Sequence, residues 1–281
     1  MSPMQLGPFG VWISSRVLDD QRAGEAAKLA EELGFGALWL GGSPKLPQLR
    51  PLLAASERLV LATGILNVWD NEPAAVAAEY AGLASEFPGR VLLGIGIGHP
   101  EATSEYANPL GTMAAFLDGL DGAPTPVARD GRCLAALGPR MLDLCAARSL
   151  GAHPYFVPVA HTRAARARLG AGALLAPELT CVLDDDPERA RATARAFAER
   201  YLALRNYASN LLRHGFAEED LAGGGSQRLL GEVVPQGSAD AIAAVAREHL
   251  DAGANHVCLQ AAGVEGVPRA EWSALSHALL A

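Results

Sequence analysis

Short apolar segments recur along this chain, and a helical pattern of apolar residues separates each segment from the next. This alternation is typical of βα units, whose parallel strands are covered on both faces and therefore do not alternate between apolar and polar residues. The sequence predicts eight such strands. They are residues 9–13, 37–40, 59–66, 91–97, 133–137, 155–159, 179–183 and 256–260.

Eight βα units predict a protein of the α/β class that folds as a single (β/α)8 TIM barrel over residues 1–281. The sequence contains no linker that would divide it. The main rival is an open doubly wound sheet, which usually has a Gly-x-Gly-x-x-Gly motif after its first strand. Ser-Ser-Arg stands at 14–16 instead, and the glycine-rich segment 94–98 falls within the fourth predicted strand.

Helix boundaries are marked by residues with known capping preferences. Gly34 and Gly253 are predicted to end the helices before the second and eighth strands. Asp186 followed by Pro187 predicts a helix start, and Ser238 predicts another. These positions support the alternation of helices and strands.

About seventy residues separate the seventh and eighth strands, far more than the few residues of a typical connection. A long helix is predicted from 187 to about 213, followed by a break at the three glycines 223–225. This long helical insertion has two interpretations, a functional lid or an oligomer contact.

Composition excludes several classes of protein. Half of the residues are hydrophobic and 19% are charged, which indicates a globular chain rather than a disordered one. A formal net charge of −8 argues against nucleic acid as a partner. We expect a cytoplasmic protein without a membrane segment, because the N-terminus does not resemble a signal peptide and no apolar run is long enough to span a bilayer. The four cysteines have no metal-binding spacing, so we expect buried, reduced thiols.

The carboxyl ends of the predicted strands indicate where a binding site lies, because barrel active sites form there. Small residues dominate these ends, and such a rim admits a flat ring close to the backbone. The sequence has no lysine there for a Schiff base and no pair of carboxylates for glycoside hydrolysis. The strand-end residues are Trp12, Ser14, 41–43, 64–70, 96–99, 138–140, His161 and Thr162.

Two predicted helix starts provide amide donors for an anion. Gly138, Pro139 and Arg140 follow the fifth strand, and His161 and Thr162 follow the sixth. Free N–H groups with a nearby arginine suit a phosphate tail, although an ordinary strand-to-helix turn explains the first of these segments equally well.

Two histidines adjoin predicted strands. His99 ends the fourth strand, where it could contact a ring or move a proton near neutral pH. His153 precedes the sixth strand, so we expect it on the opposite rim in a structural role. The three aspartates 184–186 suggest a metal site, but Asp186 is better explained as a helix cap, and we expect no metal.

Segments along the whole chain resemble the bacterial luciferase-like monooxygenase superfamily, in its branch of probable F420-dependent oxidoreductases. The resemblance depends on the order and spacing of several modest motifs. They are GFGALWLG at 34–41, LATGILNVW at 61–69, RVLLGIGIGH at 90–99, LAALGPRML at 134–142, GAHPY at 151–155 and DAGANHV at 251–257.

The resemblance implies a barrel that holds coenzyme F420 across its strand ends, with FMN as the alternative. A non-prolyl cis peptide is expected between Gly64 and Ile65, behind the ring. Ser43 is placed beside the ring, and we expect Ser43 and His99 to act in catalysis. The remaining residues are expected to bind the coenzyme, with the phosphate tail near the last five: Gly64, Ile65, Asn67, Gly96, Gly98, Leu137, Gly138, Pro139, Arg140, His161 and Thr162.

The predicted activity is hydride transfer between the deazaflavin and a small organic substrate. Two alternatives stay open, an FMN-dependent monooxygenase and a non-catalytic flavin- or F420-binding protein. Some sugar-phosphate dehydrogenases of the superfamily have an acidic residue or a histidine after the second strand, where this chain has Gly41, Gly42 and Ser43. Their proton-relay chemistry is therefore not expected here. A homodimer is expected by analogy.

Overall fold

Parallel strands form a continuous sheet in the computed structural model, which describes residues 4–102 and 106–281. Every strand pair in this sheet is parallel. The strands are β1 Phe9–Ser14, β2 Ala37–Gly41, β3 Val60–Gly64, β4 Leu66–Asn67, β5 Val91–Gly96, β6 Arg132–Leu134, β7 Gly151–Ala152, β8 Leu174–Leu175, β9 Glu178–Leu183, β10 Gln236–Gly237 and β11 Val257–Ala261.

The sheet closes into a barrel because two pairs of short strands follow one another end to end, and each pair acts as one barrel strand. β3 leads directly into β4, and β8 continues through Ala176 and Pro177 into β9. β8 pairs with β7 on one side, whereas β9 pairs with β11, which pairs with β1. The ring of pairing is thus complete among the described residues, with β10 added beyond β9. The predicted (β/α)8 fold is confirmed.

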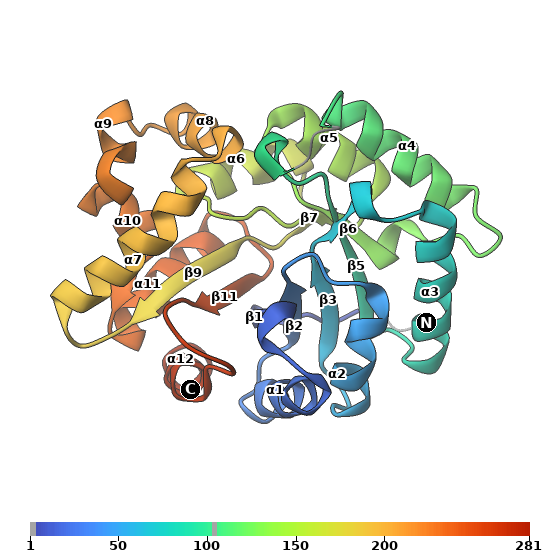
Figure 1. The fold of residues 1–281 in the computed structure, drawn as a ribbon, viewed down its shortest axis with the longest axis horizontal. Helices are drawn as coiled ribbons and strands as arrows, with labels where there is room; N and C mark the ends of the chain where they lie inside the picture. Colours follow the sequence, from blue (N-terminus) through green and yellow to red (C-terminus); the bar gives the residue numbers. More distant parts are fainter. Residues whose placement is uncertain (1–3, 103–105) are drawn as a thin grey trace.

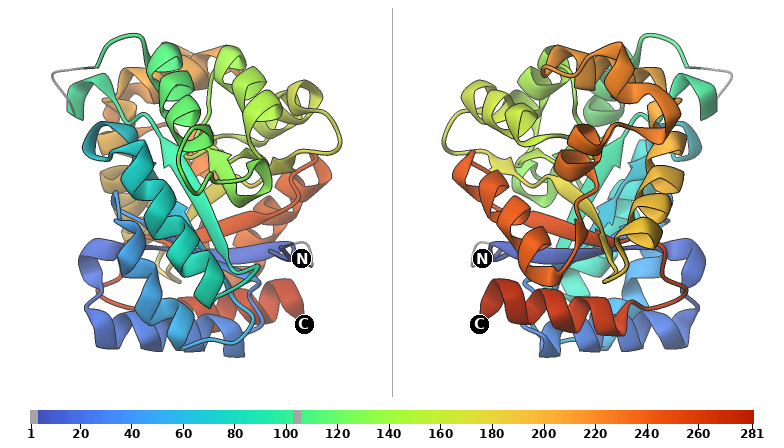
Figure 2. Two further views of the ribbon diagram at one scale, coloured as in Figure 1. Left: turned by 90° about the vertical axis from the view of Figure 1, so that its right-hand side faces the viewer. Right: turned by 90° about the vertical axis from the view of Figure 1, so that its left-hand side faces the viewer.

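Helices cover the outside of the strands (Figure 1 and Figure 2). Gly34 and Gly253 have positive φ angles of 85° and 104° after helices α1 and α11, as predicted for left-handed helix stops. The helices are α1 Asp20–Glu32, α2 Arg50–Ala54, α3 Pro73–Glu86, α4 Pro109–Asp121, α5 Pro139–Arg148, α6 Val159–Leu169, α7 Pro187–Leu202, α8 Arg205–Arg213, α9 Glu218–Leu221, α10 Gln227–Val233, α11 Ala239–Asp251 and α12 Arg269–Leu280.

The sixth predicted strand is wrong in position. The strand is β7, Gly151–Ala152, and the predicted segment 155–159 is mostly irregular and runs into α6. Pro154 and Pro158 lack the N–H that a sheet requires, and Phe156 has a positive φ of 54° that an extended strand does not accommodate. This shift moves His153 from before the strand to just after it.

The insertion between the seventh and eighth barrel strands consists of several helices instead of one long helix. α7 and α8 are separate, and α9, the short 3-10 turn at Ala222–Gly224 and α10 follow them (Figure 1). Asp186 caps α7 by accepting hydrogen bonds from the N–H groups of Glu188 and Arg189, and Ser238 caps α11, as predicted. These helices form their own apolar core, which includes Phe197, Leu211 and Leu230.

Two apolar layers hold the barrel together. One fills the barrel interior and includes Trp39, Ala62 and Leu92. The larger layer lies between strands and surrounding helices, where buried alanines of α1 and leucines of α4 pack. All four cysteines are buried and free, as expected. In the described part of the chain, helices long and apolar enough to cross a membrane are absent.

Candidate active site

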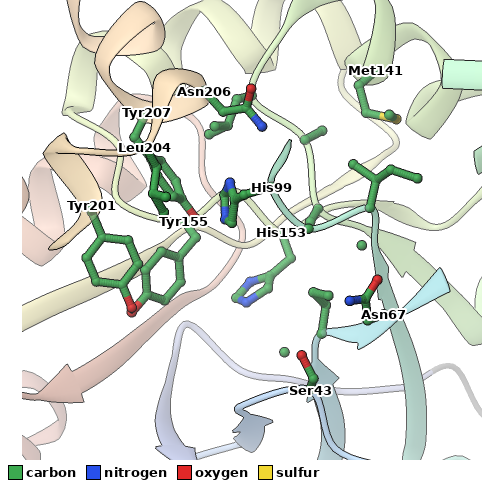
Figure 3. A pocket seen from close by; sticks show the side chains of 18 of the residues that line it. Ser43, Asn67, His99, Met141, His153, Tyr155, Tyr201, Leu204, Asn206 and Tyr207 are labelled. Carbon is green, nitrogen blue, oxygen red and sulfur yellow. The ribbon is translucent and has the colours of Figure 1, made fainter. Parts of the chain in front are cut away.

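A cavity of about 740 Å³ opens at the carboxyl ends of the barrel strands. Its lining comes from the ends of β1 to β6, the segment after β7, and helices α7 and α8 of the insertion. Figure 3 shows two facing walls, with Ser43 and Asn67 on one side and Tyr155, Tyr201 and Tyr207 on the other. His99 and His153 lie between these walls.

The strand-end wall contains the cis peptide bond between Gly64 and Ile65, at the position the resemblance indicated. Ile65 lies against Gly96, where an added β-carbon would stand 2.4 Å from the Ile65 side chain. Asn67 accepts a hydrogen bond from the N–H of Trp69 at 3.2 Å. This bond fixes the Asn67 amide beside Gly98, which has a positive φ of 65°.

Some strand-end glycines make room for protein side chains instead of a ligand. A β-carbon on Gly41 would lie 1.7 Å from the Trp12 ring, and one on Gly64 would lie 2.8 Å from Trp12 Nε1. Gly138 differs, because no atom lies within 4 Å of its added β-carbon. The rim is therefore narrow over Trp12 and open at the start of α5.

The opposite wall is aromatic and linked by hydrogen bonds. The Tyr155 hydroxyl donates to Gln260 Oε1 at 2.8 Å and lies 3.0 Å from the Tyr201 hydroxyl. Tyr207 packs 6.2 Å from Tyr155, measured between ring centroids. Burial raises the pKa of all three tyrosines, so their hydroxyls are protonated at neutral pH. This wall is uncharged.

His99 lies half-buried after β5, with its ring 4.9 Å from the ring of Tyr207. Its Nδ1 atom is buried without a hydrogen-bond partner within the described residues. Burial lowers the pKa of His99 more than the nearby Glu101 carboxylate raises it. The imidazole is therefore neutral at pH 7 and can accept a proton.

His153 lines the same cavity, which corrects its predicted place on the opposite rim. Its ring stacks on Trp39 at 4.0 Å between centroids, and only 1% of the residue is exposed. The expectation failed because the preceding strand ends at Ala152, so His153 stands at its carboxyl end. Burial lowers the pKa of His153 to about 4.

The predicted phosphate region divides into two parts. Leu137 and Gly138 line the main cavity, whereas Pro139 and His161 line a smaller neighbouring cavity of about 540 Å³. His161 lies 3.0 Å from the carbonyl oxygen of Leu137 through Nε2, and Arg140 is exposed in the first turn of α5. The Thr162 hydroxyl is buried and bonded to His249 Nδ1 at 2.8 Å, so it faces away from the main cavity.

The lining of the main cavity includes four exposed arginines, which come from the segment after β1 and from α7 and α8. They are Arg16, Arg200, Arg205 and Arg213.

Groups of three or more potential metal ligands do not occur in the described ranges.

The structure brings nine of the thirteen predicted site residues to the main cavity. Sequence patterns did not place His153 in the site, nor the tyrosine wall formed by Tyr155, Tyr201 and Tyr207. One signal was available, because Phe197 and Tyr201 are spaced by four residues and therefore share one face of α7. The nine residues are Ser43, Gly64, Ile65, Asn67, Gly96, Gly98, His99, Leu137 and Gly138.

Comparison with known proteins supports the resemblance. Residues 8–123 match the luciferase-like monooxygenase family. Over 110 residues the chain is 34% identical to an F420-dependent glucose-6-phosphate dehydrogenase of Microbacterium testaceum (strain StLB037). That alignment spans 34% of this chain and 32% of the relative, about a third of each. The expected resemblance to luciferase-like proteins is thereby confirmed.

Solved structures share the fold over nearly the whole chain. An F420-dependent secondary alcohol dehydrogenase, in complex with an F420-acetone adduct, has a TM-score of 0.76 and 15% sequence identity, with 98% of each chain covered. The FMN-bound oxygenating constituent of 3,6-diketocamphane monooxygenase from Pseudomonas putida has a TM-score of 0.66 and 13% identity, with 97% of this chain and 96% of that chain covered. At these identities, the likeness confirms the fold.

Proposed function

Because this chain combines a luciferase-like barrel with the family pattern over residues 8–123, we propose that it is an F420-dependent oxidoreductase acting on a small organic substrate. The observation that carries the proposal is the cavity of about 740 Å³ at the carboxyl ends of the strands, where barrel enzymes bind their ligands. Its volume lies within the roughly 300–1,000 Å³ typical of small-molecule sites.

The residues of the cavity fit a planar ring with an anionic tail. Ile65, Asn67 and Gly98 form the wall against which the ring would lie. Gly138 and Arg140 stand at the N-terminus of α5, which favours negative charge and suits the phosphate of the tail. His161 supports this turn through its bond to Leu137. A deazaflavin bound there supplies a carbon that exchanges hydride with the substrate.

The protein contributes orientation, proton transfer and exclusion of water. Neutral His99 accepts the proton that a substrate releases on oxidation, and its protonated form returns a proton in the reverse direction. Ser43 lines the cavity two residues after β2, where its hydroxyl orients the substrate. Helices α7 and α8 cover the cavity and limit water around the reacting groups.

A second candidate is an FMN-dependent monooxygenase, favoured by the fold shared with the FMN-bound monooxygenase component. A third candidate is a non-catalytic carrier, which would bind the coenzyme without turning over a substrate.

We also propose, from the family resemblance, that the protein is a cytoplasmic homodimer. Sedimentation of the purified protein tests the dimer.

Two measurements separate these candidates. Fluorescence titrations with oxidised F420 and with FMN identify the coenzyme, and saturable F420 binding is the expected result. Reduced F420 is then incubated without oxygen with a panel of carbonyl and enone compounds, and its reoxidation is followed. Reoxidation supports the oxidoreductase. Tight FMN binding without F420 binding favours the monooxygenase, and F420 binding without turnover across the panel favours the carrier.

A further inference from the structure

The lining of the main cavity carries charge of one sign. Among the described residues that line it, four are arginines and none is an aspartate or a glutamate. The chain as a whole has the opposite balance, with 31 acidic and 23 basic residues. A cleft lined by charge of one sign attracts ligands of the other sign. The cavity is therefore suited to an anionic ligand.

Two of these arginines, Arg16 and Arg200, lie near Tyr201. Burial raises the pKa of Tyr201, and the charges of Arg200 and Arg16 partly oppose that shift, so both guanidinium groups are close to its ring. The stem of Arg16 packs beside Gly42, where an added β-carbon would lie 3.6 Å from Arg16 Cγ. The Cζ atom of Arg200 lies over the Phe197 ring, 5.3 Å from its centroid.

Both guanidinium groups are open to a ligand. Within residues 4–102 and 106–281, the side chains of Arg16 and Arg200 form no hydrogen bond and no salt bridge, whereas Arg189 on the same helix as Arg200 is paired with Asp184. Both side chains are exposed and line the cavity, so a molecule that enters the cavity can reach them. Arginine presents its N–H donors in a fixed fork that matches the oxygens of a carboxylate or a phosphate.

The two arginines lie across the cavity from the proposed phosphate position. Around the barrel, β1 and β6 are separated by β2, β3 and β5 on one side and by β7, β9 and β11 on the other. Arg16 follows β1, whereas α5 begins after β6. Figure 3 shows Tyr201 and Met141 of α5 on opposite sides of the cavity. An anion bound by Arg16 and Arg200 is therefore distinct from a coenzyme phosphate at α5.

The other two arginines of the lining have different surroundings. Arg213 also lines the smaller cavity with Pro139 and His161, on the side of the proposed phosphate position. The backbone N–H of Arg205 donates to the Glu101 carboxylate at 3.3 Å, so a negative charge already lies at the start of α8. Arg16 and Arg200 are therefore the arginines best placed to bind an anion on the substrate.

The wall beside these two arginines is aromatic. Phe197 lines the cavity, and its ring centroid lies 4.9 Å from that of Tyr201. The Tyr201 and Tyr155 rings are 5.2 Å apart by the same measure, and their hydroxyls lie 3.0 Å from each other. An apolar ring can pack against this wall while an acidic group attached to it reaches the arginines.

We propose that Arg16 and Arg200 bind an oxyanion of the substrate, and that the substrate is an organic acid, a carboxylate or a phosphate ester, whose apolar body packs against Tyr155 and Tyr201. The inference deepens the proposed function and rests on it, since it places the acid between the coenzyme ring and the tyrosine wall. Arg16 and Arg200 are substrate-binding residues that select the acid without taking part in hydride transfer.

The test compares benzoate with benzamide, a neutral molecule of nearly the same shape. Calorimetric titrations of the full-length wild-type protein are run with and without oxidised F420, so this readout does not depend on how any variant folds. We expect benzoate to bind roughly tenfold more tightly than benzamide at low salt, because hydrogen bonds to charged groups are stronger than neutral ones. The difference should shrink as salt is added, because both arginines are exposed.

Phenyl phosphate is the third probe, and it distinguishes the two kinds of acid. Tighter binding of phenyl phosphate than of benzoate would identify a phosphate ester as the substrate class, and the reverse order would identify a carboxylate. Either order supports the anion site, provided that the anionic probe binds more tightly than benzamide.

Variants identify the arginines that are responsible. Arg16→Gln and Arg200→Gln each remove one exposed charge, and each should weaken benzoate binding roughly three- to tenfold and leave benzamide binding unchanged. Arg195→Gln is the matched control, because Arg195 is also exposed on α7 but does not line the cavity. The control should bind benzoate as the wild type does.

Three results would overturn the inference. Benzoate and phenyl phosphate could bind no more tightly than benzamide, or the two variants could bind benzoate as the wild type does. Alternatively, the variants could weaken F420 binding and spare benzoate, which would assign the two arginines to the coenzyme. If F420 does not bind at all but the preference for benzoate still depends on Arg16 and Arg200, the proposed function fails while the anion site stands.

Discussion

At the scale of single residues, Gly138 tests the location of the coenzyme's phosphate. It is the N-cap of α5 and makes no side-chain cap bond, and its added β-carbon meets nothing within 4 Å. Gly138→Asp should therefore keep or slightly raise stability, because aspartate is a good N-cap. Its negative charge should repel the phosphate and lower F420 affinity about tenfold or more.

The matched control for this change is Gly138→Asn, which offers the same cap without the charge. Urea unfolding and F420 titration are measured on both variants. Equal F420 affinities for the aspartate and asparagine variants would place the phosphate elsewhere.

The pKa of His99 is a second residue-scale prediction. Burial lowers it below 6.5, and the Glu101 carboxylate partly opposes that shift. Glu101→Gln removes the charge that favours the imidazolium, so the pKa of His99 should fall further. Histidine NMR titration measures the change, with Glu32→Gln on α1 as the control. A His99 pKa at or above 6.5 in the wild type contradicts the proposed neutral proton acceptor.

Single residues differ in how far their roles can be predicted. The turns at Gly34 and Gly253 were predictable because a left-handed helix stop depends on local backbone preference. The role of His153 was not, since it depends on where a two-residue strand ends. The stacking of His153 on Trp39 joins residues from distant strands, which no local pattern records.

At the scale of elements, α7 positions Tyr201 in the cavity lining, and the stability of this helix depends on the cap at its N-terminus. Asp186 accepts two backbone hydrogen bonds at the start of this helix. Asp186→Ala should lower the free energy of unfolding by about 1 kcal/mol. Asp185→Ala is the control, since the Asp185 side chain makes no hydrogen bond in the described ranges. If urea unfolding finds equal losses for both variants, the cap contributes nothing specific.

Element boundaries were predictable where capping residues mark them, as at Asp186 and Ser238. The predicted long helix from 187 to about 213 is instead two helices, because the chain leaves helical geometry at Leu204, whose ψ is 119°. No proline or glycine signals that break. The sixth strand was misplaced for a different reason, because Tyr155 lines the cavity and Phe156 packs in the core of the insertion instead of in the sheet.

At the scale of the whole molecule, buried titratable groups predict a stability maximum near pH 6.5. Four buried histidines, His153, His161, His249 and His256, have pKa values lowered to about 4 by burial. Between pH 6.5 and 4 the unfolded chain binds more protons than the folded chain, so the free energy of unfolding falls as the pH drops.

Glu178 acts in the opposite direction. Burial inside the barrel raises its pKa to about 8, so the folded carboxyl keeps a proton that the unfolded chain loses near pH 4.5. The free energy of unfolding should therefore fall by about 2 kcal/mol between pH 6.5 and 8. Glu178→Gln should remove this alkaline decline and steepen the acid decline, because Glu178 opposes the histidines between pH 4.5 and 6.5. Urea unfolding across pH 4–9 measures both, and an alkaline decline that persists in the variant would exclude Glu178 as its cause.

The closed barrel was predictable because eight apolar segments recur with helices between them, and the position of the cavity follows from that closure. We expect this cavity to hold a deazaflavin. A crystal structure of the protein with oxidised F420 tests it most directly. The ring should lie against Ile65, Asn67 and Gly98 with its phosphate at the N-terminus of α5. A ring bound outside this cavity, or a cavity left empty at saturating F420, would contradict the account.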